Sequence, residues 1–103
     1  MRTTAKEPLR FYPVKAITIS PAEVGAASTS AQTFSLPATP GVEGLKPGDL
    51  IKVTKPTNQT GVYVADAWVA TVNTVTILFA NCSAGNITPT AGEVYEVAIL
   101  GAT

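Results

Sequence analysis

Hydrophobic and polar residues alternate in short runs along most of the chain, and Pro, Gly or Asn separates one run from the next. Alternation with a period of two residues is typical of half-buried β-strands. No stretch shows a convincing helical period, and only the short segment 21–26 is ambiguous. The pattern therefore predicts an all-β domain, an antiparallel β-sandwich of the immunoglobulin-like or jelly-roll-like kind with about six strands. The expected strands are residues 14–19, 29–36, 49–55, 62–70, 74–80 and 93–100.

The alternation also predicts which side chains of these strands face the core. The strands 62–70 and 74–80 are joined through Val72-Asn73, a spacing typical of an antiparallel hairpin. In strand 49–55, Ile51 and Val53 share one face. On the last two strands the expected core positions are Val75, Ile77, Phe79, Tyr95, Val97 and Ile99.

Residues 1–13 carry two prolines and mixed charge without a period of 2 or 3.6. This composition predicts an extended N-terminal arm in front of a β-sandwich domain at 14–103. The arm contains Leu9, Phe11 and Tyr12, large apolar residues that a solvated tail has little use for. We expect the arm to dock on a neighbouring molecule, and the alternative is a frayed terminus.

Composition limits the classes of function. The chain has 103 residues, enough for one domain, with 46% hydrophobic and 14% charged residues. Seven basic residues balance seven acidic ones, so no broad field attracts nucleic acid or anionic lipid. The first thirty residues contain no apolar run long enough for a signal peptide or a membrane span. Cys82 is the single cysteine and excludes an intramolecular disulfide.

The residue types do not suggest catalysis. The chain has no histidine, no Gly-x-Ser-x-Gly turn and no glycine-rich phosphate motif. The carboxylate that stands out is Asp66, in the middle of an expected strand, where it could mark a β-bulge, a polar outer face or a salt bridge to Lys52 or Lys55. A catalytic Asp66 would need a second carboxylate or base beside it. We therefore expect no enzyme activity, no cofactor and no metal site.

Some large apolar residues fall on the face opposite the core. The alternation that turns the core positions inward places Leu78 and Leu100 outward, and Trp68 lies on a neighbouring strand. Such groups suit contact with another subunit. Alternatively, both sheet faces are covered within the monomer, or the register slips at a bulge near Asp66. The candidate partner-binding residues are Leu9, Phe11, Tyr12, Trp68, Leu78 and Leu100.

Turn and strand residues over most of the chain resemble a known module. Residues 44–61 contain a strand that ends in Lys55-Pro56 and continues through a Gln-x-Gly loop into a hairpin. This arrangement is similar to a module of structural proteins of tailed bacteriophages, which often carries a basic residue where this chain has Trp68. Further similar segments are residues 21–24, 32–36, 69–75, 79–81 and 87–90, so that the resemblance covers roughly residues 15–100.

The resemblance implies a component of the virion and no enzyme. We expect a capsid decoration (cement) protein, made in the bacterial host cytoplasm, that binds the major capsid protein on the capsid surface and stabilises its lattice. A homo-oligomer is expected, with a trimer favoured, and no nucleic acid or membrane partner. The alternative is a head-fibre, tail or baseplate module that binds host-surface glycan through loops 56–61 and 81–89, with Trp68 or Tyr63 stacking on a sugar ring.

Overall fold

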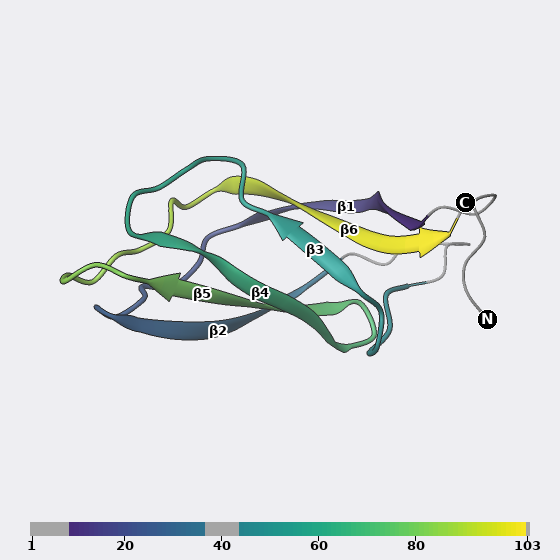
Figure 1. Ribbon diagram of the computed structural model, residues 1–103, viewed down its shortest axis with the longest axis horizontal. Coiled ribbons are helices and arrows are strands. Elements are labelled where there is room, and N and C mark those ends of the chain that lie inside the picture. Colours follow the sequence, from purple (N-terminus) through teal and green to yellow (C-terminus); the bar gives the residue numbers. More distant parts are fainter. Residues whose placement is uncertain (1–8, 37–43, 103) are drawn as a thin grey trace.

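The fold was obtained as a computed structural model, which describes residues 9–36 and 44–102. Within these ranges there is no helix, and the strands form two antiparallel three-stranded sheets of order β1-β6-β3 and β2-β5-β4. Figure 1 shows the sheets as two layers, with β3 and β4 side by side at one junction. The predicted all-β sandwich is therefore confirmed. The strands are β1 (Leu9–Ile19), β2 (Ser28–Ser35), β3 (Ile51–Thr54), β4 (Val62–Thr71), β5 (Thr74–Asn81) and β6 (Glu93–Ala102).

The predicted boundary of the N-terminal arm is wrong. β1 begins at Leu9, and residues 9–13 pair with the end of β6 in the register Leu9↔Ala102 and Phe11↔Leu100. Pro13 does not end the strand because β1 lies at the edge of its sheet and its register shifts between Pro13 and Lys15, which accommodates the missing N–H. The rest of the expected arm, residues 1–8, lies outside the described residues.

The core lies between the two sheets and contains the positions that the alternation predicts. Phe79 of β5 and Tyr95 of β6 are completely buried, and their rings meet edge to face at a centroid distance of 6.3 Å. The ambiguous segment 21–26 is not helical: Val24 is completely buried and forms an antiparallel bridge with Ile87. The confirmed core positions are Val75, Ile77, Phe79, Tyr95 and Val97, with Ile99 packed against them and partly buried.

The β4–β5 hairpin is confirmed, and its turn residue Asn73 links three parts of the chain. Asn73 adopts a left-handed conformation with φ of 57°, which asparagine tolerates better than most residues. Its N–H donates to the Leu45 carbonyl at 2.9 Å and its carbonyl accepts from the Leu36 N–H at 2.7 Å. Its side-chain Oδ1 accepts from the Leu45 N–H at 3.1 Å. Asn73 therefore holds both flanks of the segment 37–43 against the hairpin.

A β-bulge in β4 decides which side chains of that strand face solvent. Val64 pairs with Phe79 and Asp66 with Leu78, so Ala65 is an extra residue in the ladder. Val64 therefore faces the core before the bulge and Ala67 faces it afterwards, while Asp66 and Trp68 point outward. Of the alternatives for Asp66, the bulge and the outer face are confirmed.

Candidate binding surfaces

The outer face of the β2–β5–β4 sheet carries two exposed aromatic side chains. Trp68 and Tyr63 of β4 are 41% and 52% exposed, respectively. Leu78 of the central strand β5 is half-buried and lies between Ala31 of β2 and Asp66 of β4. We call this surface, defined by Tyr63, Trp68 and Leu78, the aromatic face.

The aromatic face is weakly charged. Asp66 is its one ionisable carboxylate among the described residues, and its Oδ1 accepts a hydrogen bond from the Ala67 N–H at 2.7 Å. Thr33 and Thr76 share a hydrogen bond of 3.0 Å beside Trp68 in the register. Aromatic groups among small, uncharged side chains are typical of the centres of protein interfaces. The small residues of the face are Thr29, Ala31, Thr33, Ser35, Thr74, Thr76 and Ala80.

The predicted partner-binding residues do not form one surface. Trp68 and Leu78 share the aromatic face, whereas Leu100 belongs to β6 in the opposite sheet. Leu100 lies beside Leu50, which is 64% exposed, and the Leu100 N–H donates to the Leu50 carbonyl at 2.8 Å. The backbone of Leu9, Phe11 and Tyr12 is part of β1, while their side chains lie outside the described part of the structure.

Four exposed hydrophobic residues of the described ranges were missing from the predicted partner-binding set: Leu50, Tyr63, Val72 and Val94. Tyr63 precedes the bulge, and its place on the aromatic face depends on the register shift at Ala65. Leu50 falls outside β3, although the alternation in strand 49–55 places it opposite the core positions Ile51 and Val53. The alternation would have identified Leu50 as exposed, whereas the bulge near Asp66 was one of several alternatives in the sequence and only the strand pairing selects it.

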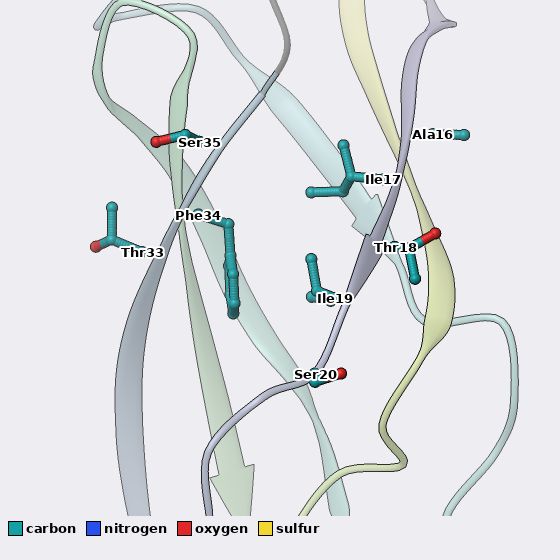
Figure 2. A pocket seen from close by; sticks show the side chains of 8 residues that line it. All are labelled: Ala16, Ile17, Thr18, Ile19, Ser20, Thr33, Phe34 and Ser35. Carbon is teal, nitrogen blue, oxygen red and sulfur yellow. The ribbon is translucent and has the colours of Figure 1, made fainter.

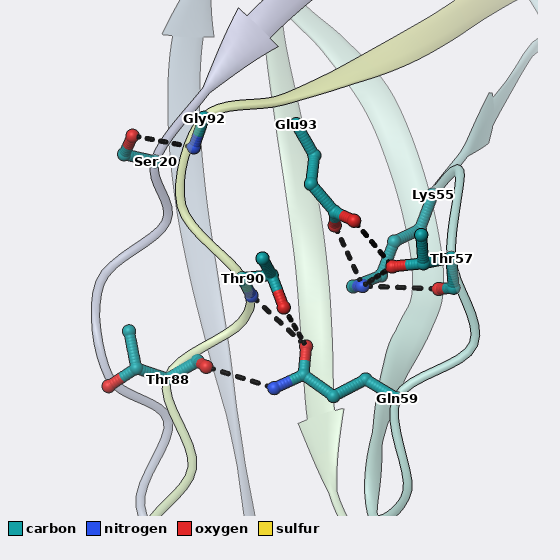
Figure 3. A network of polar contacts seen from close by, with 8 residues as sticks. All are labelled: Ser20, Lys55, Thr57, Gln59, Thr88, Thr90, Gly92 and Glu93. Carbon is teal, nitrogen blue, oxygen red and sulfur yellow. Dashed lines mark hydrogen bonds and ion pairs between the residues drawn. The ribbon is translucent and has the colours of Figure 1, made fainter.

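Thr57 and Gln59 of loop 56–61 are hydrogen-bonded within the chain (Figure 3). Lys55 Nζ and Glu93 Oε1 form a salt bridge of 3.0 Å, and the Thr57 hydroxyl donates to the other Glu93 oxygen. These bonds from Thr57 and Lys55 lower the pKa of Glu93 below its ordinary value of 4.5. The Gln59 amide donates to the Thr88 carbonyl and accepts from the Thr90 N–H, both at 3.0 Å. The network clamps the loop to the segment before β6.

Loop 81–89 is held in a similar way. Asn81 Nδ2 donates to the carbonyls of Val24 and Gly85 at 3.0 and 2.8 Å, and its Oδ1 accepts from the Ser83 N–H at 2.8 Å. Asn86 Oδ1 accepts from the Ala26 N–H at 2.9 Å. Most of the amides and hydroxyls that could bind sugar in these two loops therefore already have partners.

Three grooves in the described part of the molecule follow the two junctions between the sheets. One of about 530 Å³ lies between β1 and β2, and two of about 260 and 240 Å³ follow the junction of β3 and β4. The smallest contains Lys52 and Asp66, but no second carboxylate lines it among the described residues. Within the described ranges, no group of three or more His, Cys, Asp or Glu side chains could hold a metal ion.

Comparison of the chain with protein-family models, curated proteins and solved structures finds no match. In the part of the chain that the structure describes, no helix is long and apolar enough to cross a membrane.

Proposed function

We propose that this chain is a non-enzymatic structural protein of a tailed-bacteriophage virion, a capsid decoration protein that binds and stabilises the lattice of the major capsid protein. The bacteriophage assignment rests on the resemblance of residues 15–100 to virion structural modules. The observation that carries a binding role is the aromatic face, on which Trp68 and Tyr63 are exposed and Asp66 is the one charged residue among those described.

The aromatic face is the surface we assign to the capsid contact. The outer face of the β1–β6–β3 sheet also exposes the apolar residues Val94 and Leu50, but it carries Lys52 and Glu96 as well. Buried charges cost free energy unless they are paired, so the less charged face is the better candidate for a fully desolvated contact. Stabilisation then follows by mass action, because contacts that exist only in the assembled shell lower its free energy.

The test uses capsids purified from a phage that lacks the gene for this chain. The purified chain is added back, and its occupancy and the thermal disruption temperature of the shell are measured. We expect wild-type chain to bind and raise that temperature. Trp68→Ala should weaken binding about 30-fold, as expected for an aromatic residue at the centre of an interface.

The matched control for this test is Val94→Ala, which removes an exposed apolar side chain from the other sheet. It should change binding by about twofold or less. A chain that fails to bind the shell contradicts the proposal, and equal binding by the Trp68→Ala variant contradicts the assignment of the face. A deletion that tests the arm should remove residues 1–8 only, since Leu9 onward belongs to β1.

Glycan binding by a head-fibre, tail or baseplate module is the second candidate. The groove of about 260 Å³ beside β3 and β4 is lined by Asn58 and by Tyr63, whose ring is exposed. Thr57 and Gln59 also line it, but their polar groups bond to Glu93, Thr88 and Thr90. A glycan array separates the candidates: sugar binding that is lost in Tyr63→Ala and retained in Val94→Ala would favour the receptor-binding function.

A further inference from the structure

Edge strands of a sandwich expose unpaired backbone groups, and three of the four edges here carry features that discourage pairing with another chain. β1 contains Pro13 and a register shift, and β4 contains two register shifts and Asp66. β3 is only four residues long and contains Lys52. Short length, charge, proline and bulges are the usual means by which β-sheet proteins protect their edges.

The fourth edge, β2, has none of these features. Its eight residues, Ser-Thr-Ser-Ala-Gln-Thr-Phe-Ser, include no charge and no proline, and its register with β5 is continuous from Ser28↔Asn81 to Ser35↔Thr74. A long, regular and uncharged edge strand is a template for strand addition.

One hydrogen bond at the end of β2 shows which of its residues bond to β5 and which direct their backbone groups outward; we call this alternation the hydrogen-bonding phase of β2. The Leu36 N–H donates to the Asn73 carbonyl, just beyond the pair Ser35↔Thr74. In an antiparallel ladder, hydrogen-bonded and non-hydrogen-bonded pairs alternate. The odd-numbered residues from 29 to 35 therefore direct their N–H and C=O groups away from β5. None of these backbone groups has a partner among the described residues.

A groove lies directly beside this edge (Figure 2). It has a volume of about 530 Å³ and is lined by residues 16–20 of β1 and 33–35 of β2. Ile17 and Ile19 point from β1 towards the half-buried Phe34 of β2 across the open side of the sandwich. A strand added to β2 would place its inward side chains over these apolar groups.

We propose that the β2 edge binds the β2 edge of a second copy of this chain, which joins two sandwiches into a two-fold dimer with a continuous six-stranded sheet. In an isologous antiparallel pair, every residue faces a residue of the same strand, so a charged edge would repel itself. β2 has no charge and meets no such repulsion. The lack of charge therefore favours a second copy over a partner recognised through ion pairs.

The phase of β2 also restricts the register of the dimer, because the hydrogen-bonded pairs must oppose odd-numbered residues. Only odd-numbered residues present free backbone groups, and centring the two-fold axis on Ala31 pairs nearly the whole strand. Thr29 of one copy then lies opposite Thr33 of the other, a favourable cross-strand pair, with roughly six new backbone hydrogen bonds. The aromatic faces of both copies remain free, so this dimer is independent of the proposed capsid contact. It is a two-fold assembly, unlike the trimer expected from the sequence.

The first test measures the mass of the full chain by light scattering during size-exclusion chromatography, at loading concentrations from about 1 to 200 μM. We expect wild type to approach twice the monomer mass of 10.6 kDa. Ala31→Lys places two introduced lysines opposite each other on the axis and should leave a monomer. Ala31 is exposed, so the variant should retain the wild-type circular dichroism spectrum.

The matched control is Ala70→Lys, on an exposed position of the β4 edge, which should remain dimeric. A wild-type chain that stays monomeric or forms a trimer overturns the inference, as does a dimer that persists in Ala31→Lys. The dimer is read from the mass of the purified wild-type chain and the proposed function from the occupancy of wild-type chain on capsids, so failure of the dimer and failure of the proposed function are distinguishable.

A second test addresses the register. Ala31→Cys, in a Cys82→Ser background that removes the exposed native thiol, should form a disulfide-linked dimer under mild oxidation. Directly opposed hydrogen-bonded residues have Cα atoms about 5.5 Å apart, within the range of a disulfide. Ala70→Cys in the same background should stay monomeric on a non-reducing gel. Equal cross-linking of the two variants would contradict the proposed register.

Discussion

The core contains one buried polar atom whose removal should stabilise the protein. Tyr95 is completely buried, and its hydroxyl has no hydrogen-bond partner among the described residues. Burying a hydroxyl without a partner costs about 1–3 kcal/mol. Tyr95→Phe deletes only this oxygen and keeps the edge-to-face contact with Phe79. We expect the free energy of unfolding to rise by about 1–2 kcal/mol, after allowance for the small space left behind.

The assay is urea denaturation of the full chain at pH 7, followed by far-ultraviolet circular dichroism and by the fluorescence of the single tryptophan. In thermal unfolding the same gain corresponds to about 4–8 °C per kcal/mol for a domain of this size. Tyr63→Phe is the matched control, because the Tyr63 side chain is 52% exposed and its hydroxyl is accessible to water. The control should change stability by less than about 0.5 kcal/mol.

Whether Tyr95→Phe raises or lowers the free energy of unfolding shows whether the buried hydroxyl is unpaired. A loss of stability of 1 kcal/mol or more would mean that the hydroxyl donates to a partner, such as a buried water, in the folded protein. That result would refute the reasoning about an unpaired buried group. No change in the midpoint would show that the cost of burying the hydroxyl is much smaller than the general figure.

Four further predictions concern pH and the turn at Asn73. Burial, with a smaller contribution from Glu93, raises the pKa of Tyr95 from 10 to about 12. The free energy of unfolding is therefore unaffected by this group below pH 10 and falls by about 2–3 kcal/mol as the pH approaches 12. Tyr95→Phe should lack this loss in alkaline urea titrations. The lowered pKa of Glu93 predicts the opposite dependence on pH: the stability that ionised Glu93 contributes is present above pH 4.5 and is lost in more acidic solution. Glu93→Gln should therefore be less stable than wild type at pH 7, and the two stabilities should converge in acid. Asn73→Ala should cost about 1–3 kcal/mol in thermal unfolding, and Asn73→Gly should cost less because glycine tolerates the positive φ. Gly44→Ala should lower the melting temperature, since an added Cβ would lie 2.5 Å from Asn73 Oδ1.

The sequence by itself determined the positions of the strands and the faces that they bury. The alternation places Ile77, Phe79 and Tyr95 in the core, and all three are completely buried. Turn chemistry is equally local: the Lys46-Pro47-Gly48 turn closes with a hydrogen bond from the Asp49 N–H to the Lys46 carbonyl, with Gly48 at a φ of 98°. These features depend on neighbouring residues, so a single sequence contains them.

Only the tertiary structure decided the features that depend on pairing between distant segments. β1 extends to Leu9 because β6 provides backbone partners for residues that look like an irregular arm. The bulge at Ala65 follows from how β4 and β5 match, and it places Trp68 on the same face as Leu78 while Leu100 lies on the other sheet. Strand order and register arise from long-range hydrogen bonding and from packing of the two layers, which a local pattern of hydrophobic residues does not specify.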